Sequence, residues 1–264
     1  MFRTIPPPPE RLLVFARLPE LGKVKTRLAR SIGEAKAFAV YEAMLRDLFA
    51  SIGASSERTE IEMLWAPTDA ADGDLISRTF GNYATAMQTG ATLGDRIAMA
   101  FSERFFFHRT EKAVAIGVDD PRLSRTTIDH AFALLESCEW VLGPATDGGY
   151  YLIGCRAGAF DSTVFAGVQW GSSSVLHETL SRIAASQQTV AMLPERYDID
   201  VEDDLRRFAA DGDGGSLGEL LREWGFGVRR TGNVECLMVN VKWWCFVRAA
   251  FNLQHSTFNI PGFS

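Results

Sequence analysis

Short, continuous runs of apolar residues alternate with segments of helical periodicity from residue 11 to about residue 210. The clearest run, residues 113–116, has no polar side chain, which is typical of a strand buried on both faces of a sheet. Residues 12–16 form a second run of this kind. Between such runs, apolar residues recur at helical spacing, for example from Phe38 to Ile52. This alternation predicts an α/β fold, with a mostly parallel sheet covered by helices on both faces.

Capping and turn residues indicate where several of these elements begin and end. Thr92 and Ser124 each precede an apolar stripe and predict helix N-caps. The spacing of Ser31 and Glu34 is that of a capping box, so we also expect a helix to begin at Ser31. Asp147-Gly148-Gly149 predicts a turn that joins two strands.

Composition excludes several classes of protein. The chain has 264 residues, 27 basic and 33 acidic side chains and a net charge of −6, which disfavours a nucleic-acid partner. It has four cysteines and no C-x-x-C pair, so it is no disulfide scaffold. The N-terminus lacks the apolar core of a signal peptide, and no run is long enough to span a membrane. We expect a cytoplasmic protein without a membrane span, and its oligomeric state stays open.

Three regions differ in composition. Residues 1–10 include four consecutive prolines and predict an extended arm. Residues 11–224 carry the alternating pattern and predict one α/β domain. Residues 225–264 show no clear periodicity, and we treat them as a tail of unknown role.

A basic loop follows the first predicted strand. From Arg17 to Arg30 it has five basic side chains and one acidic one, but neither a Walker A sequence nor G-x-G-x-x-G. Doubly wound folds bind phosphates in the loop between first strand and first helix. We therefore expect Lys23, Lys25 and Arg27 to bind phosphate; the alternative is a solvated basic loop.

Acidic residues follow two other predicted strands. Asp119 and Asp120 come directly after residues 113–116, and Asp198 and Asp200 follow the last predicted strand. Carboxylates beside bound phosphates suit a hard divalent cation, Mg²⁺ or Mn²⁺, which both loops could share. The alternative interpretation is that these acids only cap turns and helix starts.

The turn at Asp147-Gly148-Gly149 is a third candidate site. Its glycines would allow a ligand to approach the backbone closely, and Asp147 could orient the hydroxyl group of an acceptor. Trp170 could form a wall of the same pocket. The alternatives are an ordinary hairpin turn and an ordinary packing role for the tryptophan.

Taken together, these segments resemble a bacterial family of glycosyltransferase-like proteins. Its members are often described as arsenosugar-biosynthesis or radical-SAM-associated glycosyltransferases, and they are related to the phospholactate guanylyltransferases of deazaflavin cofactor synthesis. The resemblance covers about residues 11–210. It rests on five motifs: Gly22-Lys23-Val24-Lys25-Thr26-Arg27-Leu28, Gly117-x-Asp119-x-Pro121-x-Leu123, Gly143-Pro144-x-x-Asp147-Gly148-Gly149-Tyr150-Tyr151-Leu152-Ile153-Gly154, Trp170-Gly171-Ser172-Ser173 and Asp198-Ile199-Asp200-Val201-Glu202-Asp203.

The resemblance implies a GT-A fold, the Rossmann-like three-layer sandwich of nucleotide-diphospho-sugar transferases. It further implies a nucleotide-sugar or NTP substrate, a small-molecule acceptor and Mg²⁺ or Mn²⁺. The matching positions make Asp119 and Asp200 the metal ligands. Arg122 stands where the family often has Asp, so the metal site depends on these two residues.

The same matches assign the remaining roles. Lys23, Lys25 and Arg27 are the phosphate-binding candidates, and Asp119 and Asp147 the catalytic ones. The substrate-binding candidates are Gly148, Gly149, Tyr151 and Trp170.

Three functions remain open from the sequence. The first is transfer of a sugar from a nucleotide-diphospho-sugar to a small acceptor. The second is nucleotidyl transfer, in which an NTP is joined to a phosphorylated small molecule and pyrophosphate is released, because the same fold could serve both reactions. The third is a nucleotide-binding module without catalytic activity.

Overall fold

We describe the fold from a computed structural model, which describes residues 9–69, 73–212 and 214–226. Within these residues, seven strands form one sheet: β1 (Glu10–Ala16), β2 (Thr59–Trp65), β3 (Ala84–Met87), β4 (Lys112–Ile116), β5 (Trp140–Pro144), β6 (Tyr150–Arg156) and β7 (Val190–Met192). The α-helices of the same residues are α1 (Thr26–Ile32), α2 (Glu34–Ile52), α3 (Gly73–Phe80), α4 (Leu93–Phe107), α5 (Arg125–Leu134), α6 (Val175–Ala185), α7 (Glu202–Asp211) and α8 (Gly215–Glu223). Two 3₁₀ turns, η1 (Ala157–Ala159) and η2 (Ser162–Phe165), follow β6.

The strands are arranged in the order β3-β2-β1-β4-β6-β5-β7. β6 runs antiparallel to its neighbours β4 and β5, and the other strand pairs are parallel. The predicted mostly parallel sheet is therefore confirmed. The antiparallel strand follows from the tight turn at Asp147-Gly148-Gly149, which joins β5 directly to β6.

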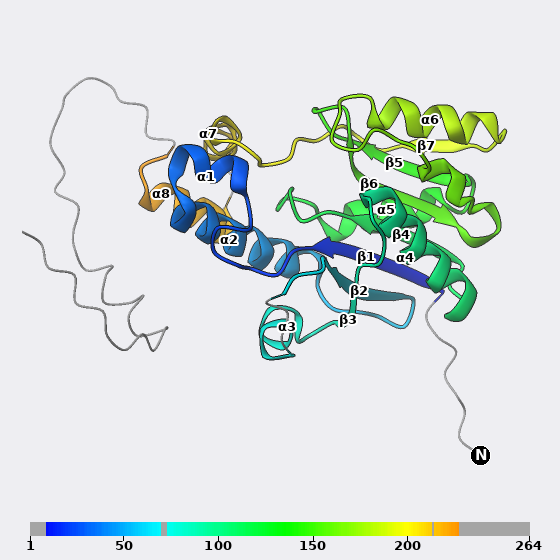
Figure 1. Cartoon of the computed structure of the whole chain (residues 1–264), viewed down its shortest axis with the longest axis horizontal. Coiled ribbons are helices and arrows are strands. Elements are labelled where there is room, and N and C mark those ends of the chain that lie inside the picture. The colour runs from blue at the N-terminus through cyan, green and yellow to red at the C-terminus, as the bar shows by residue number, and fades with distance from the viewer. Residues whose placement is uncertain (1–8, 70–72, 213, 227–264) are drawn as a thin grey trace, which may run out of the picture. The chain divides into compact units, whose positions relative to one another are not determined.

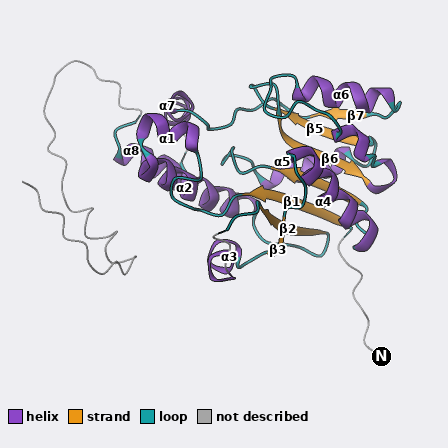
Figure 2. Ribbon diagram, viewed as in Figure 1, coloured by secondary structure: helices purple, strands orange, loops and turns teal. Residues whose placement is uncertain are grey.

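Both faces of the sheet are buried, as its apolar strands predict. On one face, Leu12 and Val114 pack with side chains of α2 and α5. On the other, Leu13 and Ala113 pack with side chains of α4, α6 and η2. Figure 2 shows the sheet with helices around it, and the predicted three-layer sandwich is confirmed.

A separate helical cluster lies beside the sheet. In Figure 1, α1, α7 and α8 gather around the N-terminal part of α2, to the left of the strands. Its apolar core includes Leu28 of α1, Phe208 of α7 and Leu217 of α8. Ile199 also packs there, so this cluster joins the basic loop to the segment that precedes α7.

The first helix differs from the prediction. α1 begins at Thr26, inside the basic loop, and α2 begins at Glu34. The expected capping box at Ser31 is wrong, because Ser31 lies within α1 and donates a hydrogen bond to the carbonyl of Leu28. Gly33, with a φ of 86°, separates the two helices. The N-caps expected at Thr92 and Ser124 are confirmed: each side-chain oxygen accepts a backbone N–H of its helix.

The predicted terminal regions lie mostly outside the described residues. β1 begins at Glu10, and the described part of the chain ends at Phe226. Residues 1–8 of the predicted arm and residues 227–264 of the predicted tail are not described. None of the helices in the described part combines the length and hydrophobicity that a membrane span requires.

Candidate functional site

A pocket of about 740 Å³ lies at the carboxyl ends of β1 and β4. Its walls come from the basic loop, the loop after β4, the β5–β6 turn, residues 170–175 and the segment before α7. Nine of the ten candidate residues line it: Lys23, Lys25, Arg27, Asp119, Asp147, Gly149, Tyr151, Trp170 and Asp200. The tenth, Gly148, is not among the lining residues.

Lys25 is the central cation of this pocket. Its ammonium group donates to Asp119 Oδ1 at 2.5 Å, to the carbonyl oxygen of Ile199 at 2.6 Å and to Asp200 Oδ1 at 3.1 Å. The side chain is only 4% exposed. Burial alone would lower the pKa of Lys25, but the attraction of the two carboxylates outweighs it and the pKa is raised. The side chain therefore stays charged.

The two predicted metal ligands face each other across this ammonium group. Asp119 and Asp200 are about half exposed, and the backbone N–H of Ile199 donates to the backbone carbonyl of Asp119 at 2.9 Å. That bond fixes the loop after β4 against the segment before α7. The predicted closeness of these two loops therefore agrees with the structure.

The donor set around Lys25 Nζ fits Mg²⁺ or Mn²⁺ in its chemistry. It consists of two carboxylate oxygens and one backbone carbonyl, and hard divalent cations prefer such oxygen ligands. In the described part of the chain, no group of three or more His, Cys, Asp or Glu side chains is arranged to hold a metal ion. The carboxylates available to a cation here are thus those of Asp119 and Asp200.

Asp198 adds a third carboxyl group to this part of the pocket. Its pKa is raised to about 7, chiefly by burial and also by the negative charges of Asp119, Asp147 and Asp200, whereas Lys25 acts to lower it. Asp198 therefore lies among other acidic side chains, and its carboxyl group is protonated more readily than an exposed one.

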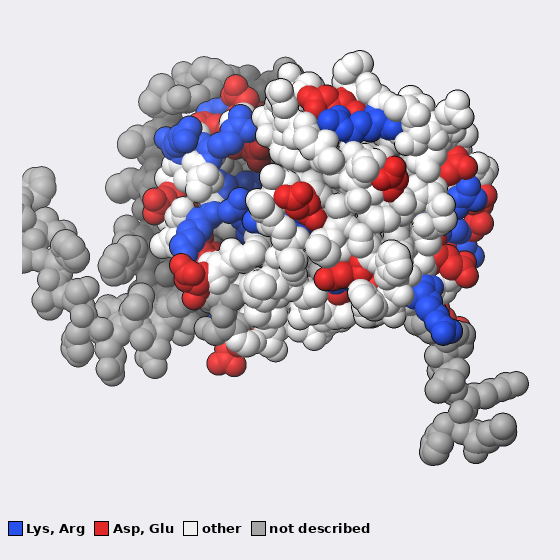
Figure 3. Space-filling view, turned by 45° about the vertical axis from the view of Figure 1, so that its right-hand side comes forward, with Lys and Arg blue, Asp and Glu red and all other residues white. Residues whose placement is uncertain are grey.

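The rim of the pocket carries the other basic side chains of the loop. Lys23 is exposed and pairs with Glu20 at 2.8 Å, and Arg27 pairs with Asp200 at 3.4 Å. Arg17 is placed by Tyr41, whose hydroxyl accepts from the Arg17 N–H and donates to its carbonyl. On the face seen in Figure 3, basic side chains lie beside acidic ones, without a continuous basic stripe on the described part of it.

The β5–β6 turn forms another part of the pocket wall. Asp147 is exposed, and its Oδ1 accepts the N–H of Gly149 at 2.9 Å. Gly148 has a φ of 90°, and a Cβ there would stand 2.2 Å from the carbonyl oxygen of Ser173. The lack of a side chain at Gly148 therefore lets the β5–β6 turn approach the loop that carries Ser173. The predicted contact of Gly148 with substrate finds no support, because Gly148 is not among the lining residues.

Aromatic side chains extend this wall. Trp170 and Tyr150 both line the pocket and meet edge to face, with ring centroids 6.3 Å apart. A Cβ on Gly94, at the start of α4, would stand 2.6 Å from Trp170 Nε1, so the indole is held against the helix. The wall thus combines aromatic faces with the carboxylate of Asp147.

Tyr151 has a structural contact as well as a place in the pocket wall. Its ring lies against Gly143, where a Cβ would be 2.4 Å from the nearest ring atom. Its hydroxyl donates to the carbonyl of Pro194 at 3.1 Å. Only 6% of Tyr151 is exposed. This burial agrees with a structural role, in which Tyr151 supports the segment after β7, at least as well as with contact to a substrate.

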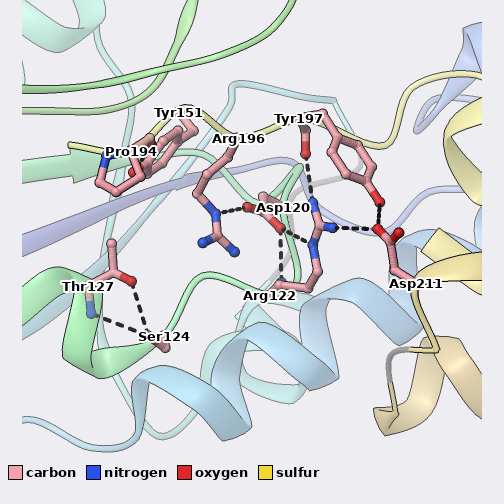
Figure 4. A network of polar contacts seen from close by, with 9 residues as sticks. All are labelled: Asp120, Arg122, Ser124, Thr127, Tyr151, Pro194, Arg196, Tyr197 and Asp211. Atoms are coloured by element: carbon pink, nitrogen blue, oxygen red, sulfur yellow. Dashed lines mark hydrogen bonds and ion pairs between the residues drawn. The ribbon is translucent and has the colours of Figure 1, made fainter. Parts of the chain in front are cut away.

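Asp120 also lines the pocket, but its buried carboxylate is engaged in a polar network, which Figure 4 shows. Its Oδ1 accepts the backbone N–H and the Nε of Arg122, and its Oδ2 accepts Nε of Arg196. The guanidinium group of Arg122 also donates to the carbonyl of Tyr197 at 3.2 Å and stacks 3.9 Å from the centre of that ring. This network ties the loop after β4 to the segment that carries Asp198.

The sequence did not point to several of these residues. Asp120 was paired with Asp119 as a possible ligand, but its carboxylate is bound by Arg122 and Arg196. Gln88 and Arg96 line the pocket, and Gln88 Nε2 donates to the carbonyls of Ala16 and Leu64. Gln88 directly follows β3, a short strand without a continuous apolar run, so the pattern that located the other loops gave no signal.

Comparison with known proteins places this architecture among relatives. Residues 53–172 match the sequence profile of a family described as "Uncharacterized protein conserved in bacteria (DUF2064)". A crystal structure of a "putative nucleotide-diphospho-sugar transferase" from Desulfovibrio desulfuricans G20 has 30% sequence identity and a TM-score of 0.77. The match covers 82% of this chain and 95% of that one. No curated protein matches the sequence.

More distant structures are also similar. A 4-diphosphocytidyl-2C-methyl-D-erythritol synthase from Anaerococcus prevotii has 11% sequence identity and a TM-score of 0.48. That match covers 74% of this chain and 92% of the synthase chain. The inositol-1-phosphate CTP transferase from T. maritima has 10% identity and a TM-score of 0.45, covering 81% and 97%. These two are too distant to bear on the reaction.

Proposed function

The chain belongs to the DUF2064 family of bacterial proteins, and from this premise we propose that it is a transferase acting on a nucleotide-linked substrate. In its specific form, the proposal is a metal-dependent glycosyltransferase. It would move a sugar from a nucleotide-diphospho-sugar to a small acceptor. The Desulfovibrio relative, whose match covers 82% of this chain, supports the class of substrate.

One observation carries the proposal: two chemically different groups of side chains line a single pocket. Lys23, Arg27 and Arg17 form the first group and suit a diphosphate. Trp170 and Asp147 belong to the second group, and an aromatic face together with a carboxylate suits a sugar or a polyol. A binding module for a nucleotide alone would need only the first group.

Each group of pocket residues has a separate role in the proposed reaction. Asp119 and Asp200 would hold Mg²⁺ or Mn²⁺, which supplies positive charge to the leaving diphosphate. The cationic side chains of the basic loop would bind the same phosphates and stabilise the charge that develops on them in the transition state. Asp147, with one carboxylate oxygen free of the Gly149 N–H, would orient the hydroxyl group of the acceptor or take its proton.

Nucleotidyl transfer is the second candidate, and one feature of the pocket favours it. Five cationic side chains line the pocket, more than a diphosphate requires: Arg17, Lys23, Lys25, Arg27 and Arg96. A triphosphate would use more of this charge. In that reaction an NTP would be joined to a phosphorylated small molecule with release of pyrophosphate.

Product analysis separates the candidates. The wild-type protein is incubated with UDP-, GDP-, ADP- or dTDP-sugars, or with NTPs, together with Mn²⁺ and a mixture of small polyols and phosphorylated acceptors. Release of a nucleoside diphosphate from a nucleotide sugar supports glycosyl transfer, and release of pyrophosphate from an NTP supports nucleotidyl transfer. Binding without either product would contradict both and favour a binding module. The Asp147→Asn variant serves as the control for reaction at this pocket.

A further inference from the structure

The ammonium group of Lys25 is fully coordinated. It has three N–H donors, and the three oxygens of Asp119, Ile199 and Asp200 lie within 3.1 Å of it. The side chain is 4% exposed, so water has little access to it. In this arrangement Lys25 has no donor left for a phosphate group, although it is the central cation of the basic loop.

The same three oxygens are the ligands that a hard divalent cation would use. Lys25 contributes one positive charge to a site that contains the carboxylates of Asp119 and Asp200, with Asp198 close by. A divalent cation at the position of Lys25 Nζ would balance the carboxylates better than the ammonium group does.

We propose that Lys25 acts as an exchangeable internal counter-ion: it fills the cation position of the ligand-free protein, and a divalent cation displaces it. This inference rests on the proposed metal dependence and adds an order of events to it. Displacement frees three N–H donors in a pocket that also receives the phosphates of the substrate. Lys25 would therefore bind phosphate only after the cation has entered.

Competition for one position has a measurable consequence, because two groups that exclude each other weaken each other's binding by the same factor. Removing the ammonium group should make Mn²⁺ bind more tightly to the nucleotide-free protein. If Lys25 acted only on phosphates, its removal would leave Mn²⁺ affinity unchanged. If Lys25 supported the cation site, its removal would weaken Mn²⁺ binding.

The first test is a titration of Mn²⁺ without nucleotide, followed by the electron paramagnetic resonance signal of the free ion. It compares the wild-type protein with Lys25→Met and with Lys23→Met. Lys23 is the matched control, because it belongs to the same loop but pairs with Glu20. We expect Lys25→Met to bind Mn²⁺ at least about tenfold more tightly than wild type, and Lys23→Met to stay within about twofold. Equal or weaker binding by Lys25→Met, or no binding by either protein, overturns the proposal.

A second test uses the wild-type chain and does not depend on the folding of a variant. Lysine side chains are reductively methylated with formaldehyde, with and without excess Mn²⁺, and the modified peptides are quantified by mass spectrometry. Lys25 should be protected without Mn²⁺ and react at least about tenfold faster with it, whereas Lys23, which is 59% exposed, should react equally in both. A rate for Lys25 that does not change with Mn²⁺ overturns the proposal.

These results can be distinguished from a failure of the proposed function. Turnover of nucleotide sugars is measured on the same wild-type preparation. If turnover depends on metal but Lys25→Met binds Mn²⁺ no more tightly than wild type, the proposed exchange of Lys25 for the cation is wrong, whereas the proposed function is supported. If both Mn²⁺ tests succeed but no nucleotide substrate is turned over, the function is wrong and the exchange stands.

Discussion

Asp120 and Arg196 form an ion pair that fastens the segment carrying Asp198 and Asp200 to the end of β4. The Asp120 side chain is 2% exposed and also accepts two hydrogen bonds from Arg122. Asp119, the next residue toward the N-terminus, faces the pocket. The two neighbouring acids thus have different partners: Asp119 contacts Lys25 in the pocket, whereas Asp120 is buried and pairs with Arg122 and Arg196.

Replacing Asp120 by Asn should destabilise the protein. The change leaves Arg196 and Arg122 without their shared carboxylate, and breaking a buried ion pair costs about 3–5 kcal/mol. Since Arg196 is partly exposed, we expect about 2–3 kcal/mol, measured by urea denaturation. Asp129→Asn is the matched control, because it removes an exposed ion pair with Arg125 and should cost less than about 0.5 kcal/mol. Equal stability of the two variants would contradict the anchoring role of Asp120.

Replacing Asp119 by Ala should abolish turnover while leaving the fold intact. Asp119 is half exposed, so its loss removes little packing, but it removes a carboxylate from the proposed cation site. We expect a fall in kcat of roughly 100-fold or more, with an unchanged far-ultraviolet circular dichroism spectrum. A variant with the wild-type rate would show that the pocket has been assigned the wrong catalytic residue.

Replacing Gly148 by Ala should disturb the acceptor side of the pocket. The new Cβ would meet the carbonyl of Ser173, and the φ of 90° disfavours any side chain, so we expect a loss of about 1–3 kcal/mol. The turn should move, and KM for the acceptor should rise more than KM for the donor. Gly158→Ala is the control, because a Cβ there meets nothing within 4 Å. Steady-state kinetics with each substrate varied in turn measure the difference.

A buried ion network at the other end of the sheet should matter for stability only. Arg104 donates to both carboxylate oxygens of Glu62, which also accepts from Arg11. Glu62→Gln would leave two buried guanidinium groups short of charge, and we expect a loss of roughly 3–5 kcal/mol. Glu103→Gln, at the exposed side of Arg104, should cost much less. Chemical denaturation of both variants measures the loss of stability. Donor binding is then measured at a temperature where both variants are folded, and weaker donor binding by folded Glu62→Gln would contradict a purely structural role of this network.

The sequence predicted the site better at the ends of central strands than at the edges of the fold. Residues 113–116 of β4 form an uninterrupted apolar run and are buried, so Asp119 was correctly expected just after a strand end. β3 is an edge strand with exposed side chains, and its pattern gave no signal for Gln88. α8 begins at Gly215 and contains Gly218, so its composition does not favour a helix, and packing against α2 is what supports it.

The contacts of Lys25 could be predicted only in part. Its loop and that of Asp119 follow neighbouring parallel strands, so their proximity could be inferred from topology. The third hydrogen bond of the Lys25 ammonium group goes to the carbonyl oxygen of Ile199, which lies 174 residues away in the sequence. The Ile199 side chain packs in the cluster formed by α1, α7 and α8, and this packing places its carbonyl beside Lys25. Such a contact is set by tertiary packing, and no local pattern encodes it.

The most direct test of the proposed function is a thermal-shift panel of UDP-, GDP-, ADP- and dTDP-sugars and the parent NTPs, each with and without Mn²⁺. A ligand that binds the native state raises its apparent stability by mass action. We predict that one nucleotide sugar raises Tm, and that it does so more strongly with Mn²⁺. Stabilisation by an NTP alone would favour nucleotidyl transfer, and no shift with any of these ligands would contradict the account of this pocket.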